Sequence, residues 1–258
     1  MADGVWDWRG SLPETSVMGA DLVFDIGATD PQVAAFQGER RRRKADAVYV
    51  DMKRQILLGD LTPTSPITEQ SLAQTYNCSQ STIREALLTL QEDGLVIRRG
   101  YQGTFVTQTT NDEAIILFRL RLNIETAAVD RITPNITQEQ LDTLREIAQQ
   151  YDSIRAKRDK IGISEADIAF HMTMLRFADM PVLEPVLLRT LLHLHRFIIT
   201  RHTRNLVWID KITASHHDLI DAIATKDPDR ARKMTIQHAT TNTIEVTEEV
   251  RMEVFAKI

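Results

Sequence analysis

The sequence predicts a mostly α-helical protein made of a small N-terminal domain and a larger helical bundle. Three observations support this prediction. Apolar residues recur at helical spacing through most of the chain after Ala45. One run rich in β-branched and aromatic residues, LVIRRGYQGTFV at 95–106, interrupts the helices and indicates a β-hairpin. At 258 residues the chain is long enough for two domains.

Composition limits the class of protein. No run of about 18 apolar residues occurs, so no transmembrane helix is expected. The N-terminus lacks the basic region and apolar stretch of a secretory signal. The single cysteine, Cys78, cannot form an internal disulfide, which fits a reducing compartment. We therefore expect a cytoplasmic protein.

Charge is distributed unevenly along the chain. Residues 1–39 carry one Lys or Arg against seven Asp or Glu, residues 40–106 carry ten against seven, and residues 107–258 carry twenty against twenty-two. Only the middle segment is basic. Alone, this is weak evidence for polyanion binding, because a solvated surface explains it better.

Residues 1–44 are expected to form an N-terminal arm. They mix Gly, Pro, Asp and Trp without sustained periodicity and end in the basic block ERRRRK at 39–44. Such a block is usually solvated. The functional alternative is contact with DNA phosphates or the minor groove beside a DNA-binding domain.

Three short helices are predicted before the hairpin. Gly59 ends the first, Thr68 caps the second and Ser79 caps the third. Their predicted buried residues are Val48, Met52, Ile56, Leu72, Ile83, Ala86, Leu87 and Leu90. Three helices followed by a hairpin, over residues 45–107, outline a winged helix-turn-helix.

In a winged helix-turn-helix the third helix enters the major groove by its N-terminal end. Short polar residues there can contact phosphates, and Gln and Arg can reach base edges. A polar helix start is also simply what an N-cap requires, but the order of the elements favours DNA binding. The predicted DNA-binding residues are Ser79, Gln80, Ser81, Thr82 and Arg84 on the helix, and Arg98, Arg99, Tyr101 and Gly103 on the hairpin.

Residues 45–106 resemble the DNA-binding domain of the GntR family of transcription regulators. The segments ILLGDLTP, EQSLA and CSQSTIREALLTLQEDGLV match the family's ILxG turn, ExxLA helix and recognition segment. The chain departs from the family at Gln80, where Arg is usual, and at Thr82, where Pro is frequent. Gln is suited to a bidentate contact with adenine, so the usual guanine contact is in doubt.

The remaining chain, residues 108–258, predicts an all-α bundle because helical patterns continue without strand alternation. Turn residues such as Thr133-Pro134, Ile161-Gly162 and Asp227-Pro228 separate the candidate helices. These helices are expected at about 112–132, 138–158, 164–179, 184–204, 211–225 and 228–253.

Four residues in this region have metal-ligand chemistry. Asp167 and His171 are four apart and share one helix face, and His216 and His238 lie on later helices. One carboxylate and three imidazoles suit zinc or another first-row divalent ion. The spacing alone is more typical of a local Asp–His contact and of ordinary core or surface histidines than of a metal site.

Residues about 110–250 resemble the FCD ligand-sensing domain of FadR-like GntR regulators. Its metal-binding members carry a DxxxH helix and two later histidines, and the four residues above match these positions one by one. The resemblance implies a divalent metal ion, zinc first and nickel, iron or manganese as alternatives, with a small carboxylate metabolite as effector. The candidate effector contacts are Arg121, His195 and Arg196.

The whole sequence therefore predicts a homodimeric regulator in the bacterial cytoplasm, bound at the nucleoid to a palindromic DNA operator. We expect a repressor. A metal-dependent enzyme on a helical bundle is the alternative, disfavoured because no nucleophile motif occurs and no further carboxylate stands beside the DxxxH pair as a general base. A non-specific DNA-packaging protein is disfavoured by the net charge of −5.

Overall fold

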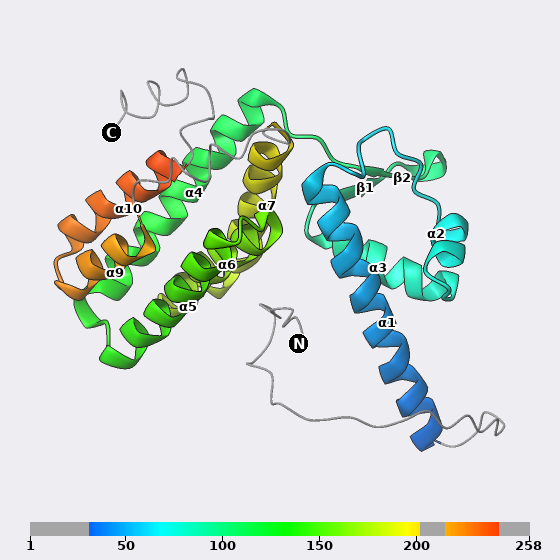
Figure 1. Cartoon of the computed structure of the whole chain (residues 1–258), viewed down its shortest axis with the longest axis horizontal. Coiled ribbons are helices and arrows are strands. Elements are labelled where there is room, and N and C mark those ends of the chain that lie inside the picture. Colours follow the sequence, from blue (N-terminus) through cyan, green and yellow to red (C-terminus); the bar gives the residue numbers. More distant parts are fainter. Residues whose placement is uncertain (1–30, 202–214, 243–258) are drawn as a thin grey trace.

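Figure 1 shows the computed structural model of the chain, which describes residues 31–201 and 215–242. The described chain is mostly helical and contains one two-stranded antiparallel sheet, which confirms the predicted fold class. The elements of the N-terminal domain are α1 (Pro31–Leu58), α2 (Glu69–Thr75), α3 (Gln80–Glu92), β1 (Val96–Arg98) and β2 (Thr104–Val106). The elements of the bundle are α4 (Asn111–Ile132), α5 (Gln138–Ala156), α6 (Lys160–Phe177), α7 (Glu184–Arg201), α9 (His216–Ala224) and α10 (Pro228–Asn242).

The N-terminal domain is the predicted winged helix-turn-helix. Its core is formed where α1 packs on α3, and the side chains of Met52, Ile56, Ile83 and Leu90 are completely buried there. The wing is the hairpin β1–β2, in which Ile97 faces Phe105 across the two strands. A short 3₁₀ turn, Gly100–Gln102, joins them.

Capping side chains begin the two helices of the helix-turn-helix at the predicted residues. The hydroxyl of Thr68 accepts the backbone N–H of Ser71, and that of Ser79 accepts the backbone N–H of Thr82, both at 3.2 Å. Between the helices Asn77 adopts a left-handed conformation with φ of 45°, which Asn tolerates better than most residues. Local residue chemistry therefore sets the angle between α2 and α3.

The first helix starts earlier than predicted. A beginning at Ala45 was expected, but α1 starts at Pro31, so the proposed arm boundary at residue 44 falls inside a continuous helix. Residues 31–44 lack a regular apolar stripe, which is why periodicity missed them, but a helix already formed from Ala45 onward can propagate through them at low cost. In Figure 1 these first turns project away from the rest of the domain. Residues 1–30 of the predicted arm lie outside the described residues.

The C-terminal bundle is built around α4. This helix contacts α6, α7 and α10, while α5 packs on α6 and α9. Capping boxes begin three of the helices: Thr110 with Glu113 at α4, Thr137 with Gln140 at α5, and Ser215 with Asp218 at α9. Each helix is thus fixed at its first turn and through its apolar face.

One predicted helix break lies earlier than expected, between Ala156 and Lys160. Gly162 was expected to separate two helices, but α6 already begins at Lys160 with Asp159 as its N-cap. A Cβ at Gly162 would lie 2.6 Å from Ile154 Cγ2 and 2.8 Å from Asp159 Oδ2. The glycine therefore allows the start of α6 to approach α5 closely, rather than ending a helix.

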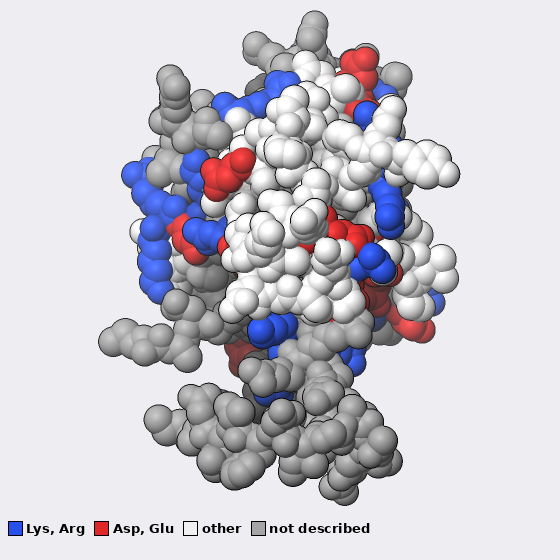
Figure 2. Space-filling view, turned by 90° about the vertical axis from the view of Figure 1, so that its right-hand side faces the viewer, with Lys and Arg blue, Asp and Glu red and all other residues white. Residues whose placement is uncertain are grey.

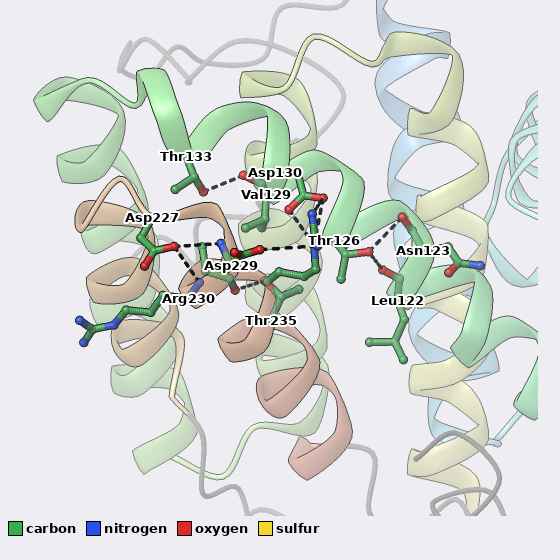
Figure 3. A network of polar contacts seen from close by, with 12 residues as sticks. Leu122, Asn123, Thr126, Val129, Asp130, Thr133, Asp227, Asp229, Arg230 and Thr235 are labelled. Atoms are coloured by element: carbon green, nitrogen blue, oxygen red, sulfur yellow. Dashed lines mark hydrogen bonds and ion pairs between the residues drawn. The ribbon is translucent and has the colours of Figure 1, made fainter. Parts of the chain in front are cut away.

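Helix α10 is fastened to α4 by polar contacts (Figure 3). The guanidinium of Arg232 donates to both carboxylate oxygens of Asp130, with the shortest N···O distance at 2.7 Å. Asp227 caps α10 by accepting the backbone N–H groups of Asp229 and Arg230. The predicted helical segments 202–204, 211–214 and 243–253 lie outside the described residues. Within the described part of the chain, no helix is long and apolar enough to cross a membrane.

Candidate DNA-binding surface and metal centre

The N-terminal end of α3 presents the polar surface that the sequence predicts. Ser79 and Gln80 are exposed, and Ser81 is partly exposed. The Ser79 hydroxyl lies 2.8 Å from the hydroxyls of both Ser81 and Thr82. These short side chains leave the backbone of the first turn accessible, as a helix that enters a groove by its end requires.

Thr82, one of the predicted DNA contacts, does not face the surface. Its side chain is buried, with 3% of its surface exposed, and it packs inside the domain while bonding to Ser79. Thr82 lies on the inner side of the first turn, next to Ile83 in the core, so it supports the N-cap rather than facing a phosphate.

Arg84 lies one turn further along the exposed side of α3. Its guanidinium donates to both oxygens of Glu69 on α2, at 3.1 and 2.7 Å. The Arg84 side chain remains 56% exposed. The hydrogen bond from Arg84 lowers the pKa of Glu69, so the carboxylate stays ionised and holds the guanidinium at the surface of the recognition helix.

The predicted wing residues gather at the tip of the hairpin. Arg98, Arg99 and Tyr101 are all exposed, and the Arg99 guanidinium lies over the Phe105 ring, 5.4 Å from its centroid. Gly103 has φ of 104° and ψ of −161°, a region that other residues rarely adopt. Figure 2 looks onto this side of the molecule, where uncharged residues cover much of the centre and Lys and Arg residues lie around it, with Asp and Glu residues among them.

The four predicted metal ligands converge in the bundle. Asp167 and His171 come from α6, His216 from α9 and His238 from α10. Each offers a ligand atom, and these atoms all lie within 4.8 Å of one another. All four side chains are buried. Residues spread over about seventy positions of sequence thus form one compact polar cluster in an apolar core.

Aromatic contacts fix the orientation of the imidazoles. The ring of Tyr151 meets the ring of His216 edge-on, with 4.4 Å between centroids, and Phe170 lies 4.2 Å from it on another side. The His216 and His238 centroids are 4.7 Å apart. Rings held in this way lose little conformational freedom when their nitrogens coordinate an ion.

The electrostatics of the cluster suit a cation. Burial lowers the pKa of His216, and burial with the neighbouring His216 and His171 lowers the pKa of His238 well below its usual range. Burial alone would raise the pKa of Asp167, but His171, His195 and His216 together lower it well below its usual range. Metal ligation requires neutral imidazoles and an ionised carboxylate, which these shifts favour.

Two nitrogens of the cluster, His171 Nδ1 and His216 Nε2, also lack a hydrogen bond within the described residues. His216 Nε2 is buried and lies 3.2 Å from Asp167 Oδ1, but it has no hydrogen-bond partner in the part of the chain that the structure describes. An unsatisfied buried polar atom costs roughly 1–3 kcal/mol. Its position beside an ionised carboxylate is one that a bound cation would satisfy, so the donor set fits a divalent metal ion.

Arg121, a predicted effector contact, lies directly against the cluster. Its Nη2 is 2.7 Å from His171 Nε2 and 3.7 Å from Asp167 Oδ2. On its other side Nε donates to Glu125 Oε1 at 2.7 Å. Burial would lower the pKa of Arg121, but Glu125 and Asp167 raise it, so the guanidinium stays charged in the core.

His195, another predicted effector contact, also lies beside the cluster. Its Nε2 lies 3.0 Å from Asp167 Oδ2, and its Nδ1 is 2.8 Å from the hydroxyl of Ser164. Ser164 was not predicted, although it lies three residues before Asp167 and so on the same side of α6. Tyr151 was not predicted either, and no local pattern marks it, because its contact with His216 is made only in the folded chain.

Arg196, the third predicted effector contact, does not face the cluster. It follows His195 on α7 but points to the N-terminal domain, where its Nε donates to the carbonyl of Ile56 at 3.2 Å and its Nη1 donates to the carbonyl of Thr107. Successive residues of a helix diverge by about 100°. Two neighbouring residues of α7 therefore face two different domains.

Comparison with known families finds a match for each of the two domains. Residues 44–106 match the family of bacterial regulatory proteins named gntR, and residues 116–241 match the FCD domain. The described helix-turn-helix lies in the first match and the Asp–His cluster lies in the second.

Individual relatives are transcription regulators. The repressor RspR of Escherichia coli is 23% identical over 206 residues, covering 79% of this chain and 87% of that protein. The uncharacterized regulator YdhC of Bacillus subtilis is 23% identical over 193 residues, covering 74% and 85%. The solved structure of E. coli McbR/YncC shares the fold with a TM-score of 0.65 at 21% identity, covering 80% of this chain and 98% of that chain.

The matched families and relatives are transcription regulators, not enzymes, so the alternative of a metal-dependent enzyme is set aside. This chain belongs to the GntR family of bacterial transcription regulators and combines the family's helix-turn-helix with a C-terminal FCD domain.

Proposed function

We propose that this regulator is a repressor whose operator binding responds to a small carboxylate held at a metal-containing FCD domain. The observation that carries the proposal is the buried cluster of Asp167, His171, His216 and His238. A purely structural role does not require three histidines and an ionised carboxylate to face one another in an apolar core. The free energy of burying such a set is recovered when it binds a cation.

Zinc is the ion that we assign first. Three imidazoles and one carboxylate, all from side chains, match the nitrogen and oxygen ligands that zinc takes. Nickel, iron and manganese accept the same ligands in larger coordination shells, so they are the alternatives. A bound divalent ion would supply positive charge, and an octahedral ion would also keep positions open for a carboxylate oxygen beyond the four protein ligands.

Arg121 and His195 are the residues that we assign to the effector. Arg121 lies 3.7 Å and His195 3.0 Å from Asp167 Oδ2, and both carry N–H donors that can face a carboxylate. Arginine binds carboxylates through two parallel hydrogen bonds, which gives specificity for this group. Arg196 is no longer a candidate at this site, because its guanidinium is engaged with the backbone of the other domain.

Repression and dimerisation complete the proposal. RspR, a relative over most of both chains, is named a repressor. Helix-turn-helix proteins commonly read two half-sites of a palindrome as dimers. Ile116 and Leu120, one turn apart on α4, are 61% and 36% exposed and are a candidate contact for a second copy of the chain.

The test compares two neighbouring histidines. His216 belongs to the cluster, whereas His217 is exposed and lies 3.0 Å from Asp152 Oδ2. We expect His216→Ala combined with His238→Ala to abolish stoichiometric zinc, measured by atomic emission on dialysed protein, and His217→Ala to retain it. Zinc and a panel of small carboxylates should shift the melting temperature of the wild type and of His217→Ala only. Wild-type zinc content in the double variant would refute the ligand set.

A further inference from the structure

One face of α7 is devoted to the backbone of the DNA-binding domain. Arg189, His193, Arg196 and Thr200 recur at intervals of four, three and four residues, so they form one stripe along the helix. Each of them contacts a backbone carbonyl, a glycine or a threonine. These groups belong to the N-terminal domain or to the segment that follows its wing. We call these four residues the α7 clamp.

Arg189 binds the end of the recognition helix. Its Nε donates to the carbonyl of Glu92, and its Nη2 donates to the carbonyl of Gln91 at 3.1 Å. These two residues are the last of α3. The final carbonyls of a helix have no partner within the helix and carry its negative dipole end, so a guanidinium there is favourable in hydrogen bonding and in charge.

His193 and Thr200 pack against two glycines. A Cβ at Gly94, which follows α3, would lie 3.0 Å from His193 Nε2. A Cβ at Gly59, which follows α1, would lie 3.2 Å from Thr200 Cγ2. His193 Nδ1 is also 3.1 Å from the hydroxyl of Thr109, beyond the wing. The clamp therefore fits closely at the ends of both α1 and α3.

Arg196 is the buried centre of the clamp. Its guanidinium joins the carbonyl of Ile56, in the last turn of α1, to the carbonyl of Thr107, directly after β2. Burial lowers the pKa of Arg196, and both carbonyls would be left without these charged donors if the side chain were removed. Hydrogen bonds from a charged donor are about twice as strong as those between neutral groups, so Arg196 holds the two segments together firmly.

The opposite side of α7 faces the Asp–His cluster. His195 contacts Asp167 and Ser164, and its neighbour Arg196 belongs to the clamp. A rotation or shift of α7 that changes the distance from His195 to Asp167 must also move Arg189 and Arg196 against the carbonyls that they bind. One rigid helix thus contacts both the sensing site and the recognition helix.

We infer that Arg189, His193 and Arg196 are positioning residues for DNA binding, which hold the recognition helix in a fixed orientation to the bundle. A domain held in place loses less freedom when it binds DNA, so the clamp raises operator affinity. A second role of α7 rests on the proposed function. When an ion occupies the Asp–His cluster, α7 changes the orientation of the recognition helix relative to the bundle.

The test uses Arg189 first, because this side chain is exposed and its removal leaves the core intact. The probe is the duplex that the wild-type protein selects from a random pool. We expect Arg189→Ala to weaken binding of this duplex about tenfold and to speed hydrogen exchange of the amides at 90–95. Arg189→Lys should recover part of both. Zinc content should stay at the wild-type level.

Arg145→Ala is the matched control. This exposed arginine pairs with Asp142 on α5 and lies outside the clamp. Arg196→Ala is the second clamp variant, and we expect it to act in the same direction with faster exchange at 56–59 and 105–109. The inference is overturned if both clamp variants bind the selected duplex as tightly as Arg145→Ala does and show the same exchange.

The role of α7 in the response to zinc is tested by the ratio of duplex affinity with zinc to duplex affinity without zinc. We expect this ratio to move toward one in Arg189→Ala, although zinc still binds the variant. If zinc binds the variant and changes its duplex affinity as much as in the wild type, α7 does not carry the signal. If zinc does not change the duplex affinity of the wild type, the proposed regulation by metal is wrong. The duplex affinities and hydrogen exchange of the clamp variants still test whether the clamp positions the recognition helix.

Discussion

Arg121 donates a hydrogen bond from Nη2 to Nε2 of His171, 2.7 Å away. Arginine has no acceptor, so the imidazole nitrogen must supply its lone pair to this bond. That same nitrogen lies 3.7 Å from Asp167 Oδ1, on the side of the cluster. A lone pair cannot serve a guanidinium and a metal ion together. An ion held through His171 Nε2 would therefore require Arg121 to release this nitrogen, and the freed donors of Arg121 could then face a carboxylate.

Removal of the guanidinium is expected to strengthen zinc binding and abolish the response to carboxylates. Arg121→Met alone would leave Glu125 buried without its partner, at a cost of about 3–5 kcal/mol. The informative variant is therefore Arg121→Met with Glu125→Gln. We expect zinc to bind it on the order of tenfold more tightly, because no guanidinium has to be displaced from the lone pair of His171 Nε2 before the ion binds. A competition titration with a chromophoric chelator measures this affinity.

The control for this variant is Arg145→Met, since Arg145 is an exposed arginine paired with Asp142 away from the cluster. Thermal-shift measurements with small carboxylates in the presence of zinc complete the experiment. Equal zinc affinity in the double variant and the control would show that Arg121 and the ion do not compete for His171.

The metal-free protein is expected to lose stability as the pH falls below 6.5. In the unfolded chain His216 and His238 take up protons near pH 6.5, whereas burial keeps their pKa values lower in the folded state. Their contribution to stability is thus complete above pH 6.5 and declines as the pH falls. Two such groups change the free energy of unfolding by up to about 2.7 kcal/mol per pH unit.

Urea unfolding in the presence of a chelator, at pH 7.5, 6.5 and 5.5, checks this expectation. The comparison is His216→Gln with His238→Gln, which lacks both titrating groups but keeps all others. The wild type should show the steeper decline between pH 6.5 and 5.5. Parallel curves for the two proteins would mean that the two buried imidazoles titrate as they do in the unfolded chain.

The sequence predicted best where local chemistry decides the structure. Ser79 caps α3 and Gly59 follows the end of α1 because capping and chain reversal depend on the residues at those positions. The spacing of Asp167 and His171 placed both side chains on one side of α6. Periodicity was therefore enough for the fold class, while the grouping of these two residues with His216 and His238 also needed the resemblance to the FCD domain.

Predictions based on a single helix were less successful where two elements meet. Arg196 and His195 were grouped because they share α7, but which domain each side chain faces depends on how α7 packs between the cluster and α1. Thr82 reads as an exposed helix start, yet the core of the domain covers it. Gly162 was predicted to break a helix. Its contact with Ile154 on α5 is visible only in the folded chain, and it shows that the glycine permits close packing of α6 on α5.

Gly162→Ala is expected to destabilise the bundle although alanine favours helices. In a solvent-exposed helix interior this change would stabilise by about 1 kcal/mol. Here the new Cβ would lie 2.6 Å from Ile154 Cγ2, so α5 and α6 must separate, at a cost of typically about 1–3 kcal/mol. A lower melting temperature of the bundle, measured by calorimetry, is the expected result. A higher one would mean that α5 adjusts without loss.

Arg84 and Glu69 are expected to have opposite effects on DNA binding. Arg84→Ala should weaken operator binding at least tenfold, since loss of a base or phosphate contact costs about 1–3 kcal/mol. Glu69→Gln removes a negative charge beside the recognition helix and frees the guanidinium, so it should strengthen binding to all duplexes. Fluorescence anisotropy over a range of salt concentrations measures both. With Arg230→Ala as control, an unchanged affinity in Arg84→Ala would exclude its assigned role.

Gln80→Arg is expected to change which base the protein prefers. Gln80 is exposed at the first position of α3, where the side chain of a helix entering the major groove meets base edges. Glutamine pairs bidentately with adenine and arginine with guanine, each with about 1–3 kcal/mol of discrimination. Selection from a random duplex pool should therefore yield adenine at one position of each half-site for the wild type and guanine there for Gln80→Arg. Because Ser79, Ser81 and the wing are unchanged, the other positions should be retained. Identical selected sequences would show that residue 80 contacts only the sugar-phosphate backbone, and Gln80→Ala would then weaken binding equally on all duplexes.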